Sequence, residues 1–437
     1  MNTQIWLPLD KWNGRFRGTG GGGWQAGYGG PGLASAIFDG YAAASTDGGH
    51  SLVNVDPSYW ALSSVGNLNL PNLQDFASVS LSDMTLLGQA VTASFYGKKP
   101  SYSYWTGCST GGRQGFMLAQ RYPDLYDGIL ANAPAVYWGS LLPAFMWPQV
   151  TMNQINYHPE LCELEAFTQA ALDACDKLDG LEDSIIVDNN ACQFDPASVV
   201  GQSYLCNGTE ERTLTSLGAQ IMEATWTGPT DSKGKRQWFG VPKDADVQYL
   251  AGTTELANGT IVGSPFAISP EWIKYFIAKD PDFSTDTLAY EQFFEILHRS
   301  RDEYAGIMDT GDADLSLYKA RGGKLISWQG AADQSIFPNQ TVLYYEHVAK
   351  QVPEVQDFFR YFQVPGIGHC GVGGPGLRVT NDLDALVDWV EHSVAPDTLK
   401  TSNVTLGGKA NRNVCAWPKL QRYNGGDSDL AKSFYCA

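Results

Sequence analysis

The sequence has no long apolar run and few positive charges. No stretch approaches the roughly 18 apolar residues needed to cross a bilayer, so we expect no membrane partner. Lysine and arginine number 29 against 47 aspartate and glutamate residues, which gives a formal charge of -18. Nucleic acids and anionic membrane surfaces would be repelled by most of such a surface. Composition therefore predicts that neither nucleic acid nor membrane is a partner.

Closely spaced cysteine pairs are also absent. The eight cysteines include no Cys-x-x-Cys pair, which argues against a zinc or redox site and favours disulfides. Asn207, Asn258, Asn339 and Asn403 each begin an Asn-x-Ser/Thr glycosylation sequon. The first residues lack the basic and apolar stretches of a secretory signal. We expect a secreted, extracellular protein whose signal has been removed.

The chain of 437 residues is long enough for a large core with one big insertion. Short apolar runs alternate with helical patterns over residues 1–135 and again from about 313 to 437, which favours an α/β fold with a parallel or mixed sheet. Residues 136–312 are instead aromatic, acidic and loop-rich. We predict one α/β domain, 1–135 and 313–437, split by a lid domain, 136–312. Apolar runs indicate strands at 41–45, before 108, at 324–328 and at 358–364, and helical patterns cover 82–96, 340–350 and 381–393.

A glycine-flanked serine follows the apolar run that ends near Cys108. Gly107-Cys-Ser109-Thr-Gly111 matches the pattern Gly-x-Ser-x-Gly, between a predicted strand and a predicted helix. Glycines allow a turn too tight for side chains, and such a turn presents the serine hydroxyl above a sheet. An ordinary glycine-rich turn is the alternative, but the flanking elements favour Ser109 as a nucleophile.

A serine hydroxyl needs a base, and histidine is the usual one. His369, in Gly366-Ile-Gly-His-Cys370, follows a predicted strand near the end of the chain, where the base of such a serine belongs. His50, in Thr46-Asp-Gly-Gly-His50, is the rival candidate. The remaining histidines are expected to be surface or packed residues: His158, His298, His347 and His392.

The acid that orients the histidine should follow a late strand, between serine and histidine in chain order. Asp333 follows the apolar run at 324–328 and fits this position. It would accept the imidazole Nδ1–H and stabilise the imidazolium formed during attack. Asp357 is the fallback, although it precedes a strand. Ser109, Asp333 and His369 therefore predict acyl transfer by a catalytic triad.

Two cysteines flank this predicted pair. Cys108 precedes Ser109, and Cys370 follows His369. A disulfide between them would hold their Cα atoms about 5.5–6 Å apart and so bring serine and histidine together. In the loop-entropy account it would also stabilise the fold by about 4–5 kcal/mol. The alternative is that both cysteines stand beside the pair by coincidence.

Acyl transfer also needs hydrogen-bond donors for the oxyanion. We expect one from the backbone N–H of Thr110 and the other from the glycine run Gly18–Trp24, with Gly22 as the donor. This run also matches the dinucleotide pattern Gly-x-Gly-x-x-Gly. A helix should follow such a loop, but Gln25–Gly32 is expected not to sustain one, so an oxyanion loop is favoured.

The motif Gly107-Cys-Ser-Thr-Gly-Gly-Arg-Gln-Gly115, with Gly330-Ala-Ala-Asp333 and Gly368-His-Cys370 downstream, resembles the fungal tannase and feruloyl esterase family. The resemblance runs from Trp12 to the last cysteine. It implies an α/β-hydrolase fold with a lid, the triad named above and the disulfide beside it. A stretch expected before the first strand is absent, and the pairing of Cys162 and Cys206 stays open.

The family carries a structural calcium ion in the lid, and the resemblance implies one here. The segment Cys175–Ile185 holds three aspartates and a turn glycine, whose oxygens suit Ca²⁺. Without the resemblance, a solvated acidic loop is an equal alternative, since the spacing is not that of an EF-hand. The implied ligands are the carboxylates of Asp176, Asp179 and Asp183 and the carbonyls of Leu181 and Ile185.

The resemblance implies a secreted serine esterase that hydrolyses esters of aromatic acids through an acyl-enzyme. Its substrate would be a small phenolic ester or an esterified carbohydrate. Feruloyl esterase is the preferred interpretation and tannase, acting on galloyl esters, the alternative. A catalytically silent binding module and a serine peptidase are rivals from other classes. At the start of the lid, aromatic residues would offer an apolar wall or pack as core: Tyr137, Trp138, Phe145 and Trp147.

Overall fold

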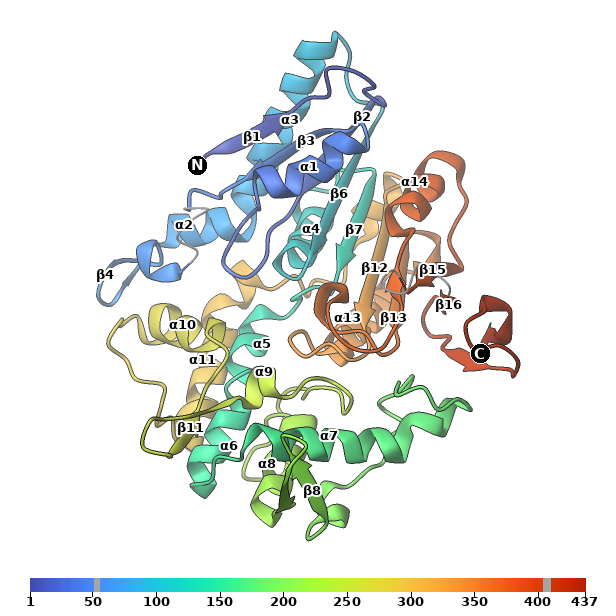
Figure 1. The fold of residues 1–437 in the computed structure, drawn as a ribbon. Helices are drawn as coiled ribbons and strands as arrows, with labels where there is room; N and C mark the ends of the chain where they lie inside the picture. The colour runs from blue at the N-terminus through green and yellow to red at the C-terminus, as the bar shows by residue number, and fades with distance from the viewer. Residues whose placement is uncertain (51–55, 404–409) are drawn as a thin grey trace.

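The structure is a computed structural model that describes residues 1–50, 56–403 and 410–437. At its centre lies a seven-stranded sheet in the order β1-β3-β2-β6-β7-β12-β13 (Figure 1). Neighbouring strands are parallel, except that β1 runs antiparallel to β3. The strands are β1 (Thr3–Trp6), β2 (Arg15–Thr19), β3 (Ala42–Thr46), β6 (Tyr102–Cys108), β7 (Gly128–Asn132), β12 (Lys324–Gly330) and β13 (Phe359–Val364).

Helices cover both faces of this sheet. Every residue of β3 and β7 is buried, as expected for parallel strands enclosed on two sides. Buried side chains of α3, α4 and α13 pack on one face, and those of α1 and α14 pack on the other. The helices are α1 (Gly30–Phe38), α3 (Ser80–Tyr96), α4 (Thr110–Arg121), α13 (Pro338–Gln351) and α14 (Asp382–His392).

Between β7 and β12 the chain leaves the sheet and forms a helical region, drawn from green to yellow in Figure 1. A large apolar core rich in tryptophan and phenylalanine holds this region together. Residues 136–312, the predicted lid, fall within this stretch. Its elements are α5 (Trp138–Ala144), α6 (Trp147–Ile155), α7 (Leu161–Cys175), β8 (Ser203–Cys206), β9 (Glu210–Thr213), α8 (Ser216–Thr227), α9 (Gln248–Ala251), β10 (Thr253–Glu255), β11 (Ile261–Gly263), α10 (Ile268–Trp272) and α11 (Tyr290–Met308).

Shorter elements complete the described chain. Before α3 lie a small hairpin and a helix that continues into a π-helical turn, and after α14 the chain ends in small antiparallel sheets. No helix in these described parts is both long and apolar enough to cross a membrane. The elements are β4 (Leu62–Ser64), β5 (Asn67–Leu68), α2 (Leu70–Gln74), the π-turn Asp75–Val79, α12 (Ser316–Ala320), β14 (Arg378–Val379), β15 (Thr398–Ser402), β16 (Asn411–Cys415), β17 (Gln421–Tyr423) and β18 (Phe434–Cys436).

All eight cysteines are paired in disulfides. The pairing of Cys162 with Cys206, left open by the sequence, is present and ties α7 to β8. A second lid bridge joins Cys175 to Cys192 and encloses the aspartate-rich loop. The others are Cys108–Cys370 and Cys415–Cys436.

The strands and helices expected from the apolar patterns agree with β3, β6, β12, β13, α3, α13 and α14 to within a few residues. One expectation is wrong. The run Gln25–Gly32 was predicted not to sustain a helix, yet α1 begins at Gly30. Pro31 occupies the first turn, where its missing N–H costs nothing, and Leu33 and Ala36 bury the helix against the sheet.

Candidate active site

Ser109 stands at the sharp turn from β6 into α4. Its backbone has φ 63° and ψ -121°, a strained conformation for a residue other than glycine. The turn is too tight for side chains, because a Cβ added to Gly107 would lie 2.5 Å from the backbone of Gly111. The N–H of Ser109 donates to the carbonyl of Asn132 at 3.0 Å, which ties the turn to the end of β7. This geometry is a nucleophile elbow.

Asp333 and His369 meet at the ends of β12 and β13. His369 Nδ1 lies 3.0 Å from Asp333 Oδ2. The aspartate is fully buried, and its other oxygen accepts the backbone N–H groups of Ser335 and Ile336 at 2.9 and 2.8 Å. Because these two N–H groups fix the carboxylate through Oδ1, Oδ2 can hold the imidazole of His369 in one orientation.

The disulfide Cys108–Cys370 joins the end of β6 to the short turn His369–Gly371, with Cα atoms 5.9 Å apart. Ser109 and His369 consequently line one pocket. Within the described contacts, no hydrogen bond joins Ser109 Oγ to His369 Nε2. Such bonds are often long in free enzymes and tighten when substrate binds.

The glycine run lies against the elbow. Gly111 N–H donates to the carbonyl of Gly21 at 3.0 Å, and the Thr110 hydroxyl donates to the carbonyl of Gly23 at 2.8 Å. Gly22 and Thr110 both line the pocket that holds Ser109. Among the described residues, no acceptor takes the backbone N–H of either one. Both predicted oxyanion donors therefore belong to residues that line the pocket of Ser109, and neither is used by an acceptor among the described residues.

The pocket has a volume of about 500 Å³, the size of a small-molecule site. The lid gives it an aromatic and aliphatic wall that includes Trp138 and Phe145. The other two aromatic residues expected there do not line this pocket. Tyr137 packs against Trp238, and Trp147 packs against Phe293. The remaining apolar side chains of the lining are Ala135, Leu142, Phe266, Ile268, Ile336 and Val372.

The family described as tannase and feruloyl esterase matches residues 1–437. The chain belongs to this family. It is therefore a carboxylic ester hydrolase.

Individual relatives agree with this assignment. A probable feruloyl esterase of Arthroderma benhamiae is 41% identical over 99% of this chain and 82% of its own length. A mono(2-hydroxyethyl) terephthalate hydrolase of Piscinibacter sakaiensis is 32% identical over 98% and 80%. The structure of tannin acyl hydrolase from Aspergillus niger superposes with a TM-score of 0.91 at 28% identity, covering 100% of this chain and 83% of that one. The predicted family and the α/β-hydrolase fold are thus confirmed.

Several pocket residues of this esterase were not predicted from its sequence. Gln334 follows Asp333 directly, and Tyr28 follows the glycine run, so adjacency to the motifs could have found both. Tyr249 and Phe266 come from the lid, with ring centroids 4.4 Å apart in a tilted arrangement, and nothing local in the sequence marks them. Burial raises the pKa of Tyr28 and of Tyr249. Apart from His369, the described residues of the lining include none of the His, Lys, Arg, Asp or Glu type.

The rival candidates lie elsewhere. His50 is buried and stacks on Trp60 at 4.0 Å, and burial lowers its pKa to about 4. It does not line the pocket of Ser109. Asp357 is exposed and precedes β13, where its carbonyl accepts Lys324 Nζ at the start of β12. It is therefore at the opposite strand ends from Asp333.

The aspartate-rich loop of the lid is held together by hydrogen bonds between its backbone and one of its carboxylates. The Asp176 carboxylate accepts three consecutive N–H groups, from Asp183 to Ile185, at 2.9–3.2 Å. Asp183 Oδ2 lies 2.8 Å from Arg412 Nη1. Burial, with neighbouring carboxylates adding to it, raises the pKa of Asp179, and burial also raises that of Asp183. The loop thus concentrates negative charge that is partly removed from water.

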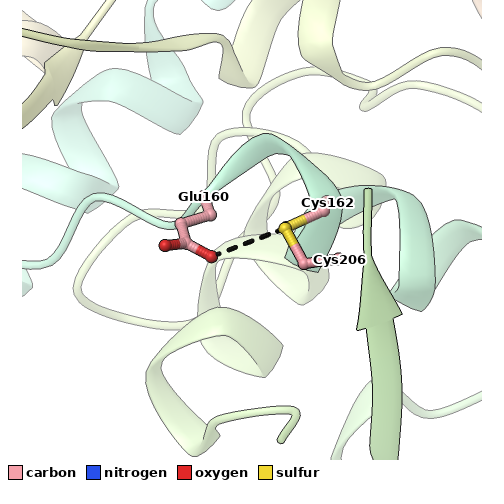
Figure 2. Close-up of side chains that lie close together, drawn as sticks. All are labelled: Glu160, Cys162 and Cys206. Carbon is pink, nitrogen blue, oxygen red and sulfur yellow. Dashed lines mark hydrogen bonds between the residues drawn. A yellow bond between two sulfur atoms is a disulfide. The ribbon is translucent and has the colours of Figure 1, made fainter. Parts of the chain in front are cut away.

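A different group of metal-ligand types lies at the other end of α7, the helix that precedes this loop. Figure 2 shows Glu160 beside Cys162 and Cys206, whose candidate ligand atoms lie within 4.8 Å of one another. Both sulfurs belong to one disulfide, so no thiolate is available to a metal. Among the described residues, the carboxylates of the aspartate-rich loop do not form a group this tight.

Proposed function

We propose that this esterase hydrolyses esters of hydroxycinnamic acids, with feruloyl esters preferred, through an acyl-enzyme on Ser109. The observation that carries the proposal is the Asp333–His369 contact of 3.0 Å, bridged by Cys108–Cys370 to the strained serine turn. These groups match the needs of acyl transfer, which are a nucleophile, a base and an oriented acid.

The reaction follows from the groups present. His369 takes the proton of Ser109 as its Oγ attacks the ester carbonyl, and Asp333 stabilises the imidazolium. The carbonyl oxygen becomes negative and accepts the N–H groups of Gly22 and Thr110. When the tetrahedral intermediate collapses, His369 returns the proton to the departing alcohol. A water molecule activated by His369 then releases the acid from Ser109.

The lining favours a feruloyl over a galloyl ring. The lid wall is aromatic and aliphatic and suits a flat ring. A galloyl ring carries three hydroxyls, whereas a feruloyl ring carries one hydroxyl and a methoxy group. The lining is mostly apolar, and each hydroxyl buried without a partner costs about 1–3 kcal/mol.

The same lining favours an uncharged acid portion. The relative from Piscinibacter sakaiensis is named for a terephthalate monoester, whose ring carries a free carboxylate. Within residues 1–50, 56–403 and 410–437, no lysine or arginine lines the pocket here. A carboxylate in this pocket would lose its hydration without gaining a cation in exchange. Terephthalate monoesters should therefore be poor substrates.

A substrate panel tests the proposal. We expect kcat/KM for methyl ferulate to exceed that for methyl gallate by about tenfold or more, since at least one hydroxyl is left unpaired. p-Nitrophenyl acetate should be hydrolysed as an activated ester, and a peptide amide should not be cleaved. A preference for methyl gallate would support the tannase alternative, amide cleavage would support a peptidase, and no turnover of any ester would leave only a binding module.

We further propose that the protein works outside the cell on small phenolic esters or feruloylated carbohydrate. Four disulfides support this location, because such bonds persist in oxidising compartments.

We also propose that the aspartate-rich loop binds a structural Ca²⁺ ion. Both carboxylate oxygens of Asp183 are buried without a hydrogen-bond partner, apart from the nearby guanidinium of Arg412. Asp179 is half-buried beside it. Hard oxygen donors of this kind suit calcium. The ligands would be the carboxylates of Asp176, Asp179 and Asp183 and the carbonyls of Leu181 and Ile185, and the ion would neutralise a partly buried acidic loop.

A further inference from the structure

Gln334 lies between the catalytic acid and the catalytic base. Its Oε1 accepts the backbone N–H of His369 at 3.0 Å. The same oxygen would lie 2.8 Å from a Cβ added to Gly368, so the amide packs directly on the histidine turn. One end of this side chain is thereby fixed to the segment that carries the base.

The other end of the amide is free. Gln334 is partly exposed and lines the pocket that contains Ser109 and His369. Within the described residues, no acceptor takes a hydrogen bond from its Nε2. Because Oε1 is held by His369, the direction of the Nε2–H donors is set before any substrate arrives.

The position of Gln334 relates it to the alcohol portion of the ester. His369 must hand its proton to the departing oxygen, so the alcohol has to lie beside the imidazole. The acid portion is attached to the other side of the carbonyl carbon. Val372, on the same turn as His369, lines the pocket and is 64% exposed, so this side opens to solvent.

We propose that Gln334 forms the alcohol subsite of this esterase, where its Nε2–H recognises an oxygen of the alcohol portion while its Oε1 fixes the histidine turn. This inference rests on the hydrolytic function proposed above. The Nε2–H group donates to a hydroxyl or ether oxygen of the alcohol, while Oε1 positions the backbone of His369. A methyl ester places no oxygen there, so the amide discriminates between alcohols that carry the same acid.

Two substitutions distinguish the contribution of the Oε1 acceptor of Gln334 from that of its Nε2–H donor. Gln334→Glu keeps an oxygen for the His369 N–H but replaces the donor by a second acceptor. Gln334→Met has similar length and offers neither group. Gln220→Glu is the matched control, because it makes the same change at an exposed position on α8, outside the pocket.

The experiment measures kcat/KM for feruloyl arabinose and for methyl ferulate with each variant. We expect the ratio of the two values to fall five- to tenfold in Gln334→Glu and Gln334→Met, the loss of about one hydrogen bond, and to stay unchanged in Gln220→Glu. Gln334→Met should also lower kcat on methyl ferulate. Gln334→Glu should raise the pH at which the acidic limb of the rate profile falls, because its charge stabilises the imidazolium.

The outcomes distinguish this inference from the function on which it rests. An unchanged ratio in both Gln334 variants, with the native enzyme active on both esters, overturns the alcohol subsite. A native kcat on methyl ferulate in Gln334→Met overturns the positioning role. If the native enzyme hydrolyses neither ester, the proposed function itself is wrong.

Discussion

The two sides of the pocket come from differently built parts of the molecule. The proposed reactive groups follow strands of one half of the sheet, with Ser109 after β6, Asp333 after β12 and His369 after β13, and β7 lies between β6 and β12. The facing wall comes from lid helices and loops, which pack through aromatic side chains. Side chains at the ends of hydrogen-bonded strands have fixed positions. The apolar side chains of the facing wall can be replaced without moving these reactive groups. Substitutions of the reactive groups in the α/β domain, called the body below, should therefore reduce turnover. Substitutions in the lid should instead change substrate preference.

The largest effect is expected at the nucleophile. Ser109→Ala should lower kcat on methyl ferulate by about four orders of magnitude or more, because the covalent route is lost. Its melting temperature should stay near that of the native enzyme, since only one hydroxyl is removed. Steady-state kinetics and thermal melting check both statements. Retention of more than about a tenth of the activity would show that Ser109 is not the nucleophile.

The next effect concerns the bridge within the body. Replacing Cys108 and Cys370 together by alanine should lower kcat by about a hundredfold, because a shift of about 1 Å between serine and histidine is enough for that. The melting temperature should also fall, since the bridge restricts the unfolded chain. Kinetics are measured at a temperature where the variant is folded, as judged by circular dichroism. Full turnover there would make the bridge a stabilising element only.

A lid substitution should have the opposite character. Phe266→Ala removes a ring that contacts Tyr249 and Phe145 at the pocket wall. We expect kcat/KM for methyl ferulate to fall about tenfold, from lost apolar and ring contacts. p-Nitrophenyl acetate, which has no ring in its acid portion, should be hydrolysed nearly as before. Phe283→Ala, elsewhere in the lid, is the control, and equal losses on both substrates would contradict a role in specificity.

Removal of calcium should loosen the lid and spare the body. Exhaustive chelation should lower the melting temperature by several degrees, because an ion bound only to the folded state stabilises it. At temperatures below melting, turnover should largely persist, since no proposed ligand lines the pocket. Differential scanning calorimetry and elemental analysis measure the effect. Unchanged melting with no bound metal would show that the loop is merely solvated.

The last prediction is a pH dependence of stability in the lid, with no effect expected on turnover. Burial raises the pKa of Asp244 from 3.8 to about 6, so the folded protein holds a proton that the unfolded chain releases. This contribution to stability is complete below pH 3.8 and is lost as pH rises through about 6. Asp244→Asn cannot ionise, so it should match the native protein near pH 4 and exceed it near pH 7.5.

The gain in unfolding free energy should be about 3 kcal/mol at most, from a shift of about two pKa units. Denaturant unfolding at the two pH values measures it. An equal difference at both would mean that Asp244 is not the titrating group. Asp246→Asn serves as the control, since Asp246 is exposed nearby.

Much of the chemistry could be predicted from the sequence because it depends on neighbours along the chain. Gly107, Ser109 and Gly111 specify the elbow through local sterics. Cys108 and Cys370 flank the reactive pair directly, so one covalent bond relates residues that are otherwise distant. The family motifs and the buried parallel strands are local patterns as well. These features determined the family, the fold class and the candidate triad.

Only the tertiary structure decided which side chains surround the substrate. Trp138 and Phe145 line the pocket, whereas Tyr137 packs against Trp238 and Trp147 packs against Phe293. All four are aromatic residues from the same short stretch of sequence, so the sequence does not distinguish them. His50 was the rival candidate for the general base, but in the structure it stacks on Trp60 outside the pocket of Ser109. The orientation of Gln334 depends on a hydrogen bond across two loops. Contacts between segments far apart in sequence arise from packing of the whole chain. Hydrophobic periodicity and local propensity describe only neighbouring residues, so they do not predict such contacts.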